Sequence, residues 1–119
     1  MKNMSNHEKI NYIELPAKDL IKTKKFFNKA FGWSFVDYGS EYMAFAGAGI
    51  DGGFYQSKLS CSTKTGSALV VLFSKTLEQT QIKIEEFGGK IIQPIFSFPG
   101  GRRFHFSDPN GNEYAVWSE

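Results

Sequence analysis

The sequence has one cysteine, two histidines and four prolines among its 119 residues. The single cysteine, Cys61, excludes a disulfide-stabilised scaffold, which needs paired cysteines, and fits a reducing compartment. There is no run of ~18 apolar residues, so no membrane-spanning helix is predicted. The polar segment 1–9 does not resemble a secretory signal. These absences predict a cytoplasmic protein without a membrane partner.

A large charge of either sign is also lacking, because 14 basic residues face 12 acidic ones and the net charge is +2. Disordered chains carry a larger net charge and few aromatic residues. Nucleic-acid-binding proteins have a strong basic excess. Residues 101–106 resemble an RNA-recognition strand in their aromatic spacing, but the interleaved glycines of that motif are missing. We therefore expect no nucleic-acid partner.

Aromatic residues, by contrast, are abundant: they make up 16% of the chain, with twelve phenylalanines, five tyrosines and two tryptophans. A chain of this length has a limited interior. Some aromatic side chains must fill the core, and the remainder predict an apolar pocket, an interface, or both.

The order of sequence patterns predicts two copies of a unit made of a strand, a helix and three strands. Asp19 is a suitable N-cap for the first helix and Gly32 ends it. The second helix opens with the capping-box spacing of Thr76 and Gln79. The predicted elements are strand 9–16, helix 19–31 and strands 34–38, 42–46 and 52–55, then strand 68–73, helix 76–87 and strands 90–96, 103–106 and 113–117.

The two units match position by position, although few residues are identical. When the ends of the two predicted helices are aligned, Ile13 aligns with Val70 and Leu15 aligns with Leu72, so that apolar residues align with apolar residues. Such self-similarity indicates an internal repeat. The predicted fold is therefore α+β, in one domain over residues 1–119, with module one at about 9–55, a linker at about 56–67 and module two at about 68–118.

Paired units with these landmarks resemble the vicinal oxygen chelate superfamily, which includes glyoxalase I, bleomycin- and fosfomycin-resistance proteins and extradiol dioxygenases. The resemblance implies two βαβββ modules that form a partly open barrel with a cleft, and it implies a homodimer. The segments that carry it are residues 13–20 (IELPAKDL), 26–33 (FFNKAFGW), 87–91 (FGGKI) and 106–113 (FSDPNGNE).

Metal-dependent members of that superfamily hold a divalent ion with His or Glu at four strand positions. The resemblance places these positions at Tyr12, Gly53, Leu69 and Ala115. Leucine, alanine and glycine side chains cannot bind a metal ion, and tyrosine is a poor ligand at its usual pKa of ~10. A shift of one residue along each strand does not restore a site. We therefore expect no metal and no cofactor, which makes glyoxalase or dioxygenase activity doubtful.

Strand alternation indicates which side chains share a face with these four positions. The face is mainly aromatic and aliphatic with a few polar groups, as in a small-molecule pocket. The predicted ligand-binding residues are Tyr12, Glu14, Gly53, Tyr55, Leu69, Phe73, Arg103, His105, Ala115 and Trp117.

His105 and Glu14 are the candidate catalytic residues. His105 lies three residues before Asp108, at a position where the resemblance implies a substrate-contacting side chain, so that it would form a hydrogen bond in the cleft or transfer a proton. The alternative is a half-exposed strand histidine without a task. Glu14 is either a base with a raised pKa or the partner of a nearby lysine or arginine. Arg103, beside Arg102, either holds an anion or is an exposed loop residue.

The leading hypothesis is thus a protein that binds a small aromatic or amphipathic molecule in an apolar cleft without a metal ion. The alternative is a lyase, similar to lactoylglutathione lyase, or a dioxygenase-type enzyme that uses non-standard residues.

Overall fold

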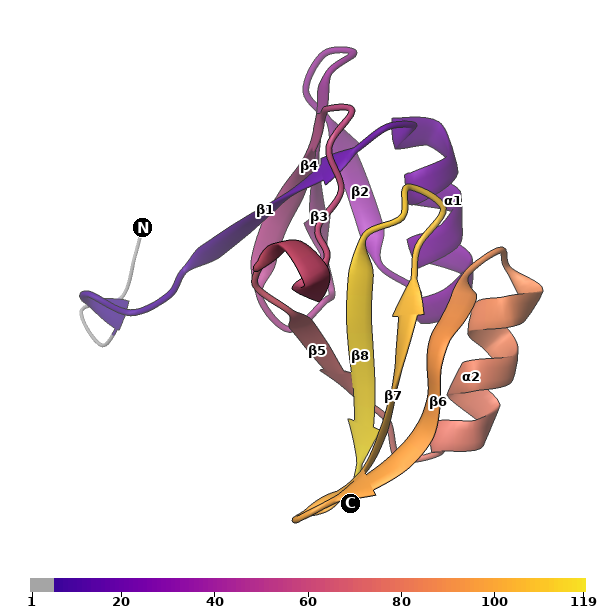
Figure 1. The fold of residues 1–119 in the computed structure, drawn as a ribbon. Helices are drawn as coiled ribbons and strands as arrows, with labels where there is room; N and C mark the ends of the chain where they lie inside the picture. Colours follow the sequence, from indigo (N-terminus) through magenta and orange to yellow (C-terminus); the bar gives the residue numbers. More distant parts are fainter. Residues whose placement is uncertain (1–5) are drawn as a thin grey trace.

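The computed structural model describes residues 6–119, which form two four-stranded sheets and two α-helices (Figure 1). None of the helices in these residues has the length and apolar character needed to cross a membrane. The elements are β1 (Tyr12–Ala17), α1 (Leu20–Phe31), β2 (Ser34–Asp37), β3 (Tyr42–Ala46), β4 (Asp51–Gln56), the 3-10 turn η2 (Thr63–Thr65), β5 (Val70–Phe73), α2 (Leu77–Glu86), β6 (Lys90–Phe98), β7 (Gly101–Ser107) and β8 (Glu113–Ser118).

Both sheets have the same topology. The N-terminal sheet has the order β1-β4-β3-β2 and the C-terminal sheet the order β5-β8-β7-β6. In each sheet the first strand runs parallel to the last strand of its unit, and the other pairs are antiparallel. The predicted α+β class and the two βαβββ units are therefore confirmed, and the two sheets do not close into one barrel.

The first helix begins and ends as the sequence predicts. The Asp19 side chain accepts a hydrogen bond of 3.0 Å from the Lys22 amide, which satisfies one of the free N–H groups of the first turn. Gly32 has a φ of 75° and its N–H donates to the Asn28 carbonyl. Only glycine adopts this left-handed conformation at little cost, so the helix stops there.

The second helix begins differently, and the predicted capping box is wrong. The Thr76 side chain makes no capping hydrogen bond. The Ser74 hydroxyl accepts from the Thr76 amide instead, because a serine two residues earlier forms a local turn of its own. The strand that follows the linker is shorter than predicted, since β5 starts at Val70 and leaves Leu69 outside it.

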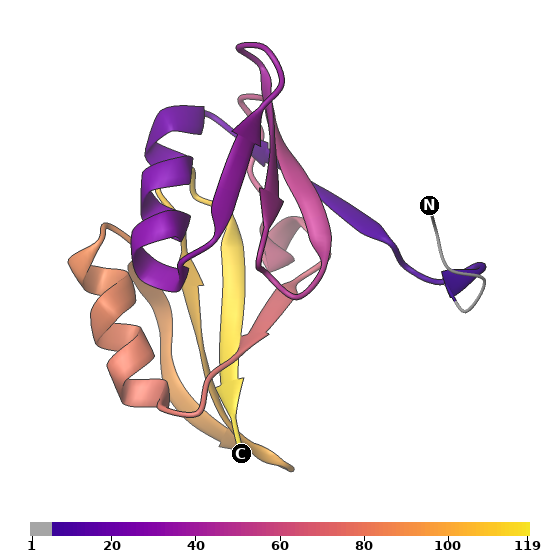
Figure 2. The ribbon, with the colours of Figure 1, turned by 180° about the vertical axis from the view of Figure 1, so that it is seen from behind.

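The two helices lie next to each other on one side of the molecule, α1 beside the N-terminal sheet and α2 beside the C-terminal sheet (Figures 1 and 2). Phe27 of α1, which is fully buried, stacks on Trp33 with a centroid distance of 4.6 Å. The same ring contacts Phe54 of β4 and Tyr114 of β8. One aromatic side chain thus belongs to the cores of both sheets.

A buried polar turn also joins the two units. Asp108 accepts hydrogen bonds from the Asn110 and Asn112 amides, although burial raises the pKa of its carboxyl group. The Asn110 side-chain oxygen accepts from the amides of Lys18 and Asp19, and the Asn112 amide group donates to the Pro16 carbonyl. The turn before β8 therefore satisfies backbone groups at the end of β1.

Candidate functional site

The N-terminal sheet has an outer face, defined as the face opposite α1. Pairing of the strands places Glu14 beside Gly53 and Gly53 beside Ala44. Phe54, the next residue along β4, points the other way and contacts Phe27 of α1. Because side chains alternate along a strand, four residues of the predicted ligand-binding set share this outer face, and they are Tyr12, Glu14, Gly53 and Tyr55.

Tyr42 of β3 organises this outer face. Its hydroxyl lies 2.6 Å from the Tyr12 hydroxyl and donates a hydrogen bond of 2.8 Å to Glu14 Oε2. A Cβ atom at Gly53 would overlap the Tyr42 phenol, so a glycine is needed for the ring to reach Glu14. Burial and the bonds to Tyr12 and Glu14 raise the pKa of Tyr42 above its ordinary value. Glu14 therefore pairs with a tyrosine rather than with a lysine or arginine.

The outer face of the C-terminal sheet carries the other part of the predicted set. The pairing of β7 with β8 sets His105 beside Ala115 and Arg103 beside Trp117. Phe73 of β5 contacts Trp117 with a centroid distance of 5.1 Å. Leu69 lies one residue before β5.

His105 forms a buried pair with Glu113 on this face. His105 Nδ1 lies 2.7 Å from Glu113 Oε2, and only 9% of the His105 side chain is exposed. Burial acts to raise the pKa of Glu113, but hydrogen bonds from Thr63 and His105 outweigh it and lower that pKa. An ionised carboxylate only accepts hydrogen bonds. Nδ1 therefore carries a proton, and His105 Nε2, which is buried, has no partner within residues 6–119.

Arg103 and Arg102 are neighbours with different surroundings. The guanidinium carbon of Arg103 lies 5.4 Å from the ring centroid of Phe96 and 5.8 Å from that of Phe98. No carboxylate among the described residues pairs with it, and its buried Nε has no partner there either. Arg102 instead forms an exposed ion pair with Glu78, at 2.6 Å.

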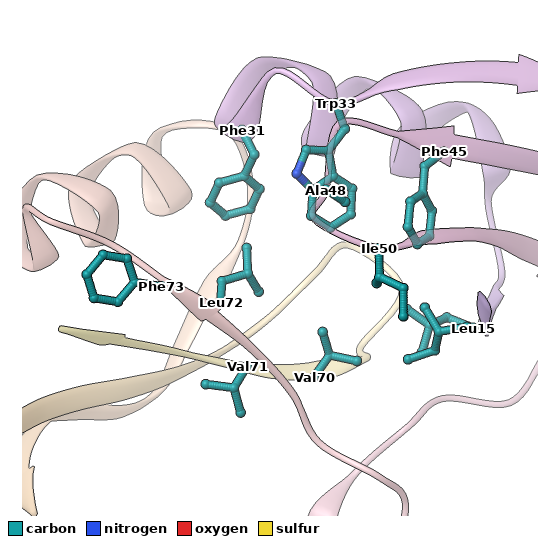
Figure 3. Close-up of a pocket in the computed structure, with 11 residues that line it drawn as sticks. Leu15, Phe31, Trp33, Phe45, Ala48, Ile50, Val70, Val71, Leu72 and Phe73 are labelled. Carbon is teal, nitrogen blue, oxygen red and sulfur yellow. The ribbon is translucent and has the colours of Figure 1, made fainter. Parts of the chain in front are cut away.

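A cavity of about 370 Å³ lies between the two sheets (Figure 3). One wall comes from the helix-facing side of the N-terminal sheet and the end of α1, and the other wall is β5. All the residues that line it are apolar: Ile13, Leu15, Phe31, Trp33, Phe45, Ala48, Ile50, Val70, Val71, Leu72 and Phe73. Phe73 is the member of the predicted ligand-binding set among them.

Sequence reasoning did not find Tyr42, the role of Glu113 or most of this cavity. A signal for Tyr42 was present, because Gly53 interrupts a strand and a strand glycine often marks the close approach of another group. The lining residues of the cavity carried no such signal. Ile13, Leu15 and Val70 have the alternation and composition of ordinary core residues.

The four positions that the resemblance assigns to a divalent ion do not fit such an ion. Gly53, Leu69 and Ala115 have no side-chain donor atom, and the Tyr12 hydroxyl is hydrogen-bonded to Tyr42. Tyr42 fills the space beside Gly53, and Ala115 is fully buried. Within residues 6–119, no group of three His, Cys, Asp or Glu residues is placed to hold a metal.

Comparison with known proteins agrees with the fold. The model of the Glyoxalase/Bleomycin resistance protein/Dioxygenase superfamily matches residues 9–116. The chain therefore belongs to this superfamily. A search of the curated proteins finds no match.

Among solved structures, a glyoxalase-related enzyme from Fulvimarina pelagi superposes with a TM-score of 0.78, at 18% identity over 94% of this chain and 88% of that one. The fosfomycin resistance protein FosX from Listeria monocytogenes gives 0.77, at 17% identity over 94% and 93%. An integron cassette protein from V. cholerae gives 0.65, at 21% identity over 99% and 97%. At these identities the likeness shows a shared fold.

Proposed function

We propose that this protein binds a small aromatic or amphipathic molecule in the cavity between its two sheets. The observation that carries the proposal is the cavity itself, about 370 Å³ in volume and lined by apolar side chains alone. Ligand pockets have volumes of roughly 300–1,000 Å³ and predominantly apolar walls. The cavity is at the small end of this range, which favours a ligand of one or two rings.

Exposure of its walls also supports the proposal. Ile50, Val71 and Phe73 are 37%, 45% and 49% exposed although they line the cavity. A ligand that covers these apolar side chains removes them from water, which stabilises the complex by about 25 cal/mol per Å² of apolar surface buried.

The test is a substitution that fills the cavity, compared with the same substitution at a matched position outside it. Ala48 lines the cavity, whereas Ala46, at the end of β3, lies on the outer face of the same sheet. We expect Ala48→Phe to weaken binding of 2-naphthol at least tenfold and Ala46→Phe to change it less than twofold. The readout is the indole N–H resonance of Trp33, a lining residue, followed by NMR during the titration.

Three results would overturn the proposal. They are equal effects of the two substitutions, a ligand-induced shift at Trp117 with none at Trp33, and no binding of 2-naphthol at all.

Binding is proposed to be independent of metal ions. The support is the donor set, since three of the four positions that the resemblance assigns to an ion have no donor atom. Divalent manganese or zinc should leave the Tm unchanged, and a chelator should have no effect. A rise in Tm that a chelator reverses would contradict this part of the proposal.

We also propose that the protein is a cytoplasmic homodimer. The lone Cys61 fits the cytoplasm, and the partly exposed rings of Tyr12 and Tyr55 are apolar surface that a second copy would cover. Sedimentation equilibrium should give twice the mass of 13.4 kDa, and a monomer at micromolar concentration would contradict it.

Enzymatic activity as a lyase or dioxygenase is the second candidate. The observation that favours it is His105, whose ring is oriented by Glu113 and whose Nε2 has no partner in the described part of the chain. Turnover of a 2-oxoaldehyde–thiol adduct or a catechol, abolished by His105→Gln, would establish it.

A further inference from the structure

We propose that a groove between the two helices binds a phosphorylated molecule with a planar ring, of the chemical class of the nucleoside diphosphates. The groove lies where α1 faces the C-terminal end of α2 and the turn before β8, and its volume is about 610 Å³. Ligand pockets have volumes of roughly 300–1,000 Å³. The groove shares no lining residue with the cavity between the sheets, and the proposal does not depend on ligand binding in that cavity.

Helix α1 has positive charges and no negative ones. It contains four lysines and no aspartate or glutamate. Three of these lysines, Lys22, Lys25 and Lys29, are exposed and line one side of the groove. Their spacings of three and four residues place them on one face of the helix, where neighbouring like charges destabilise it. The row of lysines therefore does not serve the stability of α1, which points to a role in binding.

The three lysines of the groove also have no carboxylate partner. None of the ion pairs within residues 6–119 includes them. The remaining lysine of the helix differs, because Lys24 Nζ lies 2.8 Å from Asp37 Oδ1. Among the residues that line the groove, three lysines and one glutamate leave a net charge of +2. A ligand with two or three negative charges would neutralise it.

Lysine in such a row favours phosphate over carboxylate. Its ammonium group is a point charge with three rotatable donors, so it can reach phosphate oxygens from different directions. A carboxylate is instead matched by the planar fork of arginine, and no arginine lines the groove. The row extends over seven residues of helix, or roughly 10 Å, which suits two linked phosphates better than one.

The rest of the groove is largely apolar. Phe26 of α1, Phe87 after α2 and Pro109 line it. Gly89 allows the end of α2 to come close to Phe26, since a Cβ atom at Gly89 would lie 3.1 Å from that ring. Aromatic side chains pack favourably against planar rings. The groove thus places apolar surface for a ring beside the charges for the phosphates.

Glu86 is the one acid among the lining residues. An ionised carboxylate only accepts hydrogen bonds, so it would repel a phosphate but accept from a hydroxyl group. Carboxylates bind the ribose hydroxyl groups of nucleotides in this way in other folds. Glu86 therefore favours a ligand that has a sugar between its ring and its phosphates.

The test is a titration with ADP, with adenosine as the probe without phosphates and pyrophosphate as the probe without a ring. A chelator excludes bridging metal ions, and 0.15 M salt screens charges further apart than about 8 Å. We expect ADP to shift the backbone amide resonance of Gly88, which lines the groove, and to leave the indole resonances of Trp33 and Trp117 unmoved. Adenosine and pyrophosphate should bind at least tenfold more weakly.

Lys24 provides the matched control for Lys25. Lys25→Gln and Lys24→Gln remove the same charge from adjacent positions of α1, but Lys24 does not line the groove and is paired with Asp37. Lys25→Gln should weaken ADP binding at least fivefold, and Lys24→Gln less than twofold. Lys25→Gln should not lower the Tm, because it removes a charge three residues from Lys22 and four from Lys29.

Equal losses in the two variants would overturn the proposal, as would a lower Tm for Lys25→Gln, which would show that the lysine serves the fold. Equal affinity for adenosine or pyrophosphate, tighter binding of hexaglutamate than of ADP, or no ADP binding at millimolar concentration would overturn it too. None of these results bears on the binding of 2-naphthol at Trp33, so the failure of one proposal is distinguishable from the failure of the other.

Discussion

The two sheets share one strand order, yet their outer faces differ in chemistry. On the N-terminal sheet the outer face has a chain of hydroxyl and carboxylate groups from Tyr12, Tyr42 and Glu14, and these groups lie at the surface. On the C-terminal sheet it has a buried pair, His105 and Glu113, next to aromatic rings.

The difference arises from what covers each face. Residues of the linker lie against β8, where the Cys61 carbonyl accepts from the Glu113 amide and Thr63 donates to the Glu113 side chain. On the N-terminal sheet, the ring of Tyr42 fills the space beside Gly53. The two sheets therefore have the same topology but different polar groups buried on their outer faces, because different segments cover them.

The largest predicted effect concerns Phe27, which contacts both units. Phe27→Ala should lower the free energy of unfolding by about 3–5 kcal/mol, since it leaves a cavity in a core shared by the two sheets. Urea unfolding followed at Trp33 and at Trp117 should give coincident transitions. Phe73→Ala, at a half-exposed ring, should cost less than about 1 kcal/mol. Survival of the Trp117 signal after loss of the Trp33 signal would show that the two units unfold separately.

Removal of the acid on each outer face compares the faces directly. Glu113→Ala should cost about 2 kcal/mol, because it leaves the buried His105 Nδ1–H without an acceptor. Glu14→Ala, at an exposed carboxylate, should change stability by less than about 0.5 kcal/mol. Urea midpoints measure both, and equal losses would contradict the difference in burial.

An effect of similar size is expected at Gly53, where the last strand of the first unit differs from the last strand of the second unit, which has Ala115. Replacing a strand glycine by alanine ordinarily stabilises by about 0.4–1 kcal/mol. Gly53→Ala should instead destabilise by roughly 1–3 kcal/mol, because the new Cβ meets the Tyr42 phenol and the Met43 carbonyl. Ala115→Gly should cost about 1 kcal/mol or less. A thermal-unfolding series that shows Gly53→Ala to be stabilising would be inconsistent with the position of Tyr42.

The smallest effects should appear at opposite ends of the pH range. The lowered pKa of Glu113 stabilises the fold above the ordinary value of 4.5, and this contribution is lost as the pH falls through the lowered pKa. The stability difference between wild type and Glu113→Gln should therefore shrink from about pH 7 to about pH 3.

For Tyr42 the sign is reversed. Its pKa is raised, so its contribution is present below the ordinary value of 10.0 and is lost as the pH rises through the raised pKa. The difference between wild type and Tyr42→Phe should shrink in alkali. A difference that stays constant across either range would contradict the corresponding assignment.

Much of the fold follows from sequence patterns, because local signals and tertiary structure agree. Asp19 and Gly32 delimit α1 as predicted, and strand alternation correctly sets Tyr12, Glu14 and Gly53 on one face. The boundaries of the modules and the ligand-binding residues stay predictions.

What could not be predicted depends on contacts between units. The cavity forms where the inward side of one sheet meets the edge strand of the other, so Leu15 and Val70 line it together although nothing in their own strands indicates this. The pairing of His105 with Glu113 depends on the register of β7 and β8, which sets Ser107 opposite Glu113. At Thr76 the spacing indicated a capping box, but the Thr76 amide donates to the Ser74 hydroxyl instead.

The turn at Asn110 has a consequence for the order in which the chain is completed. Its side chain binds backbone amides of Lys18 and Asp19, which are 92 and 91 positions earlier. Synthesis proceeds from the N-terminus, so the first unit leaves the ribosome long before the residues that satisfy the end of its first strand exist. Contacts of such long sequence separation form late and slowly. The backbone amides of Lys18 and Asp19 therefore lack their native acceptor until the last tenth of the chain has been synthesised. We expect chaperones that bind during translation to bind the N-terminal unit.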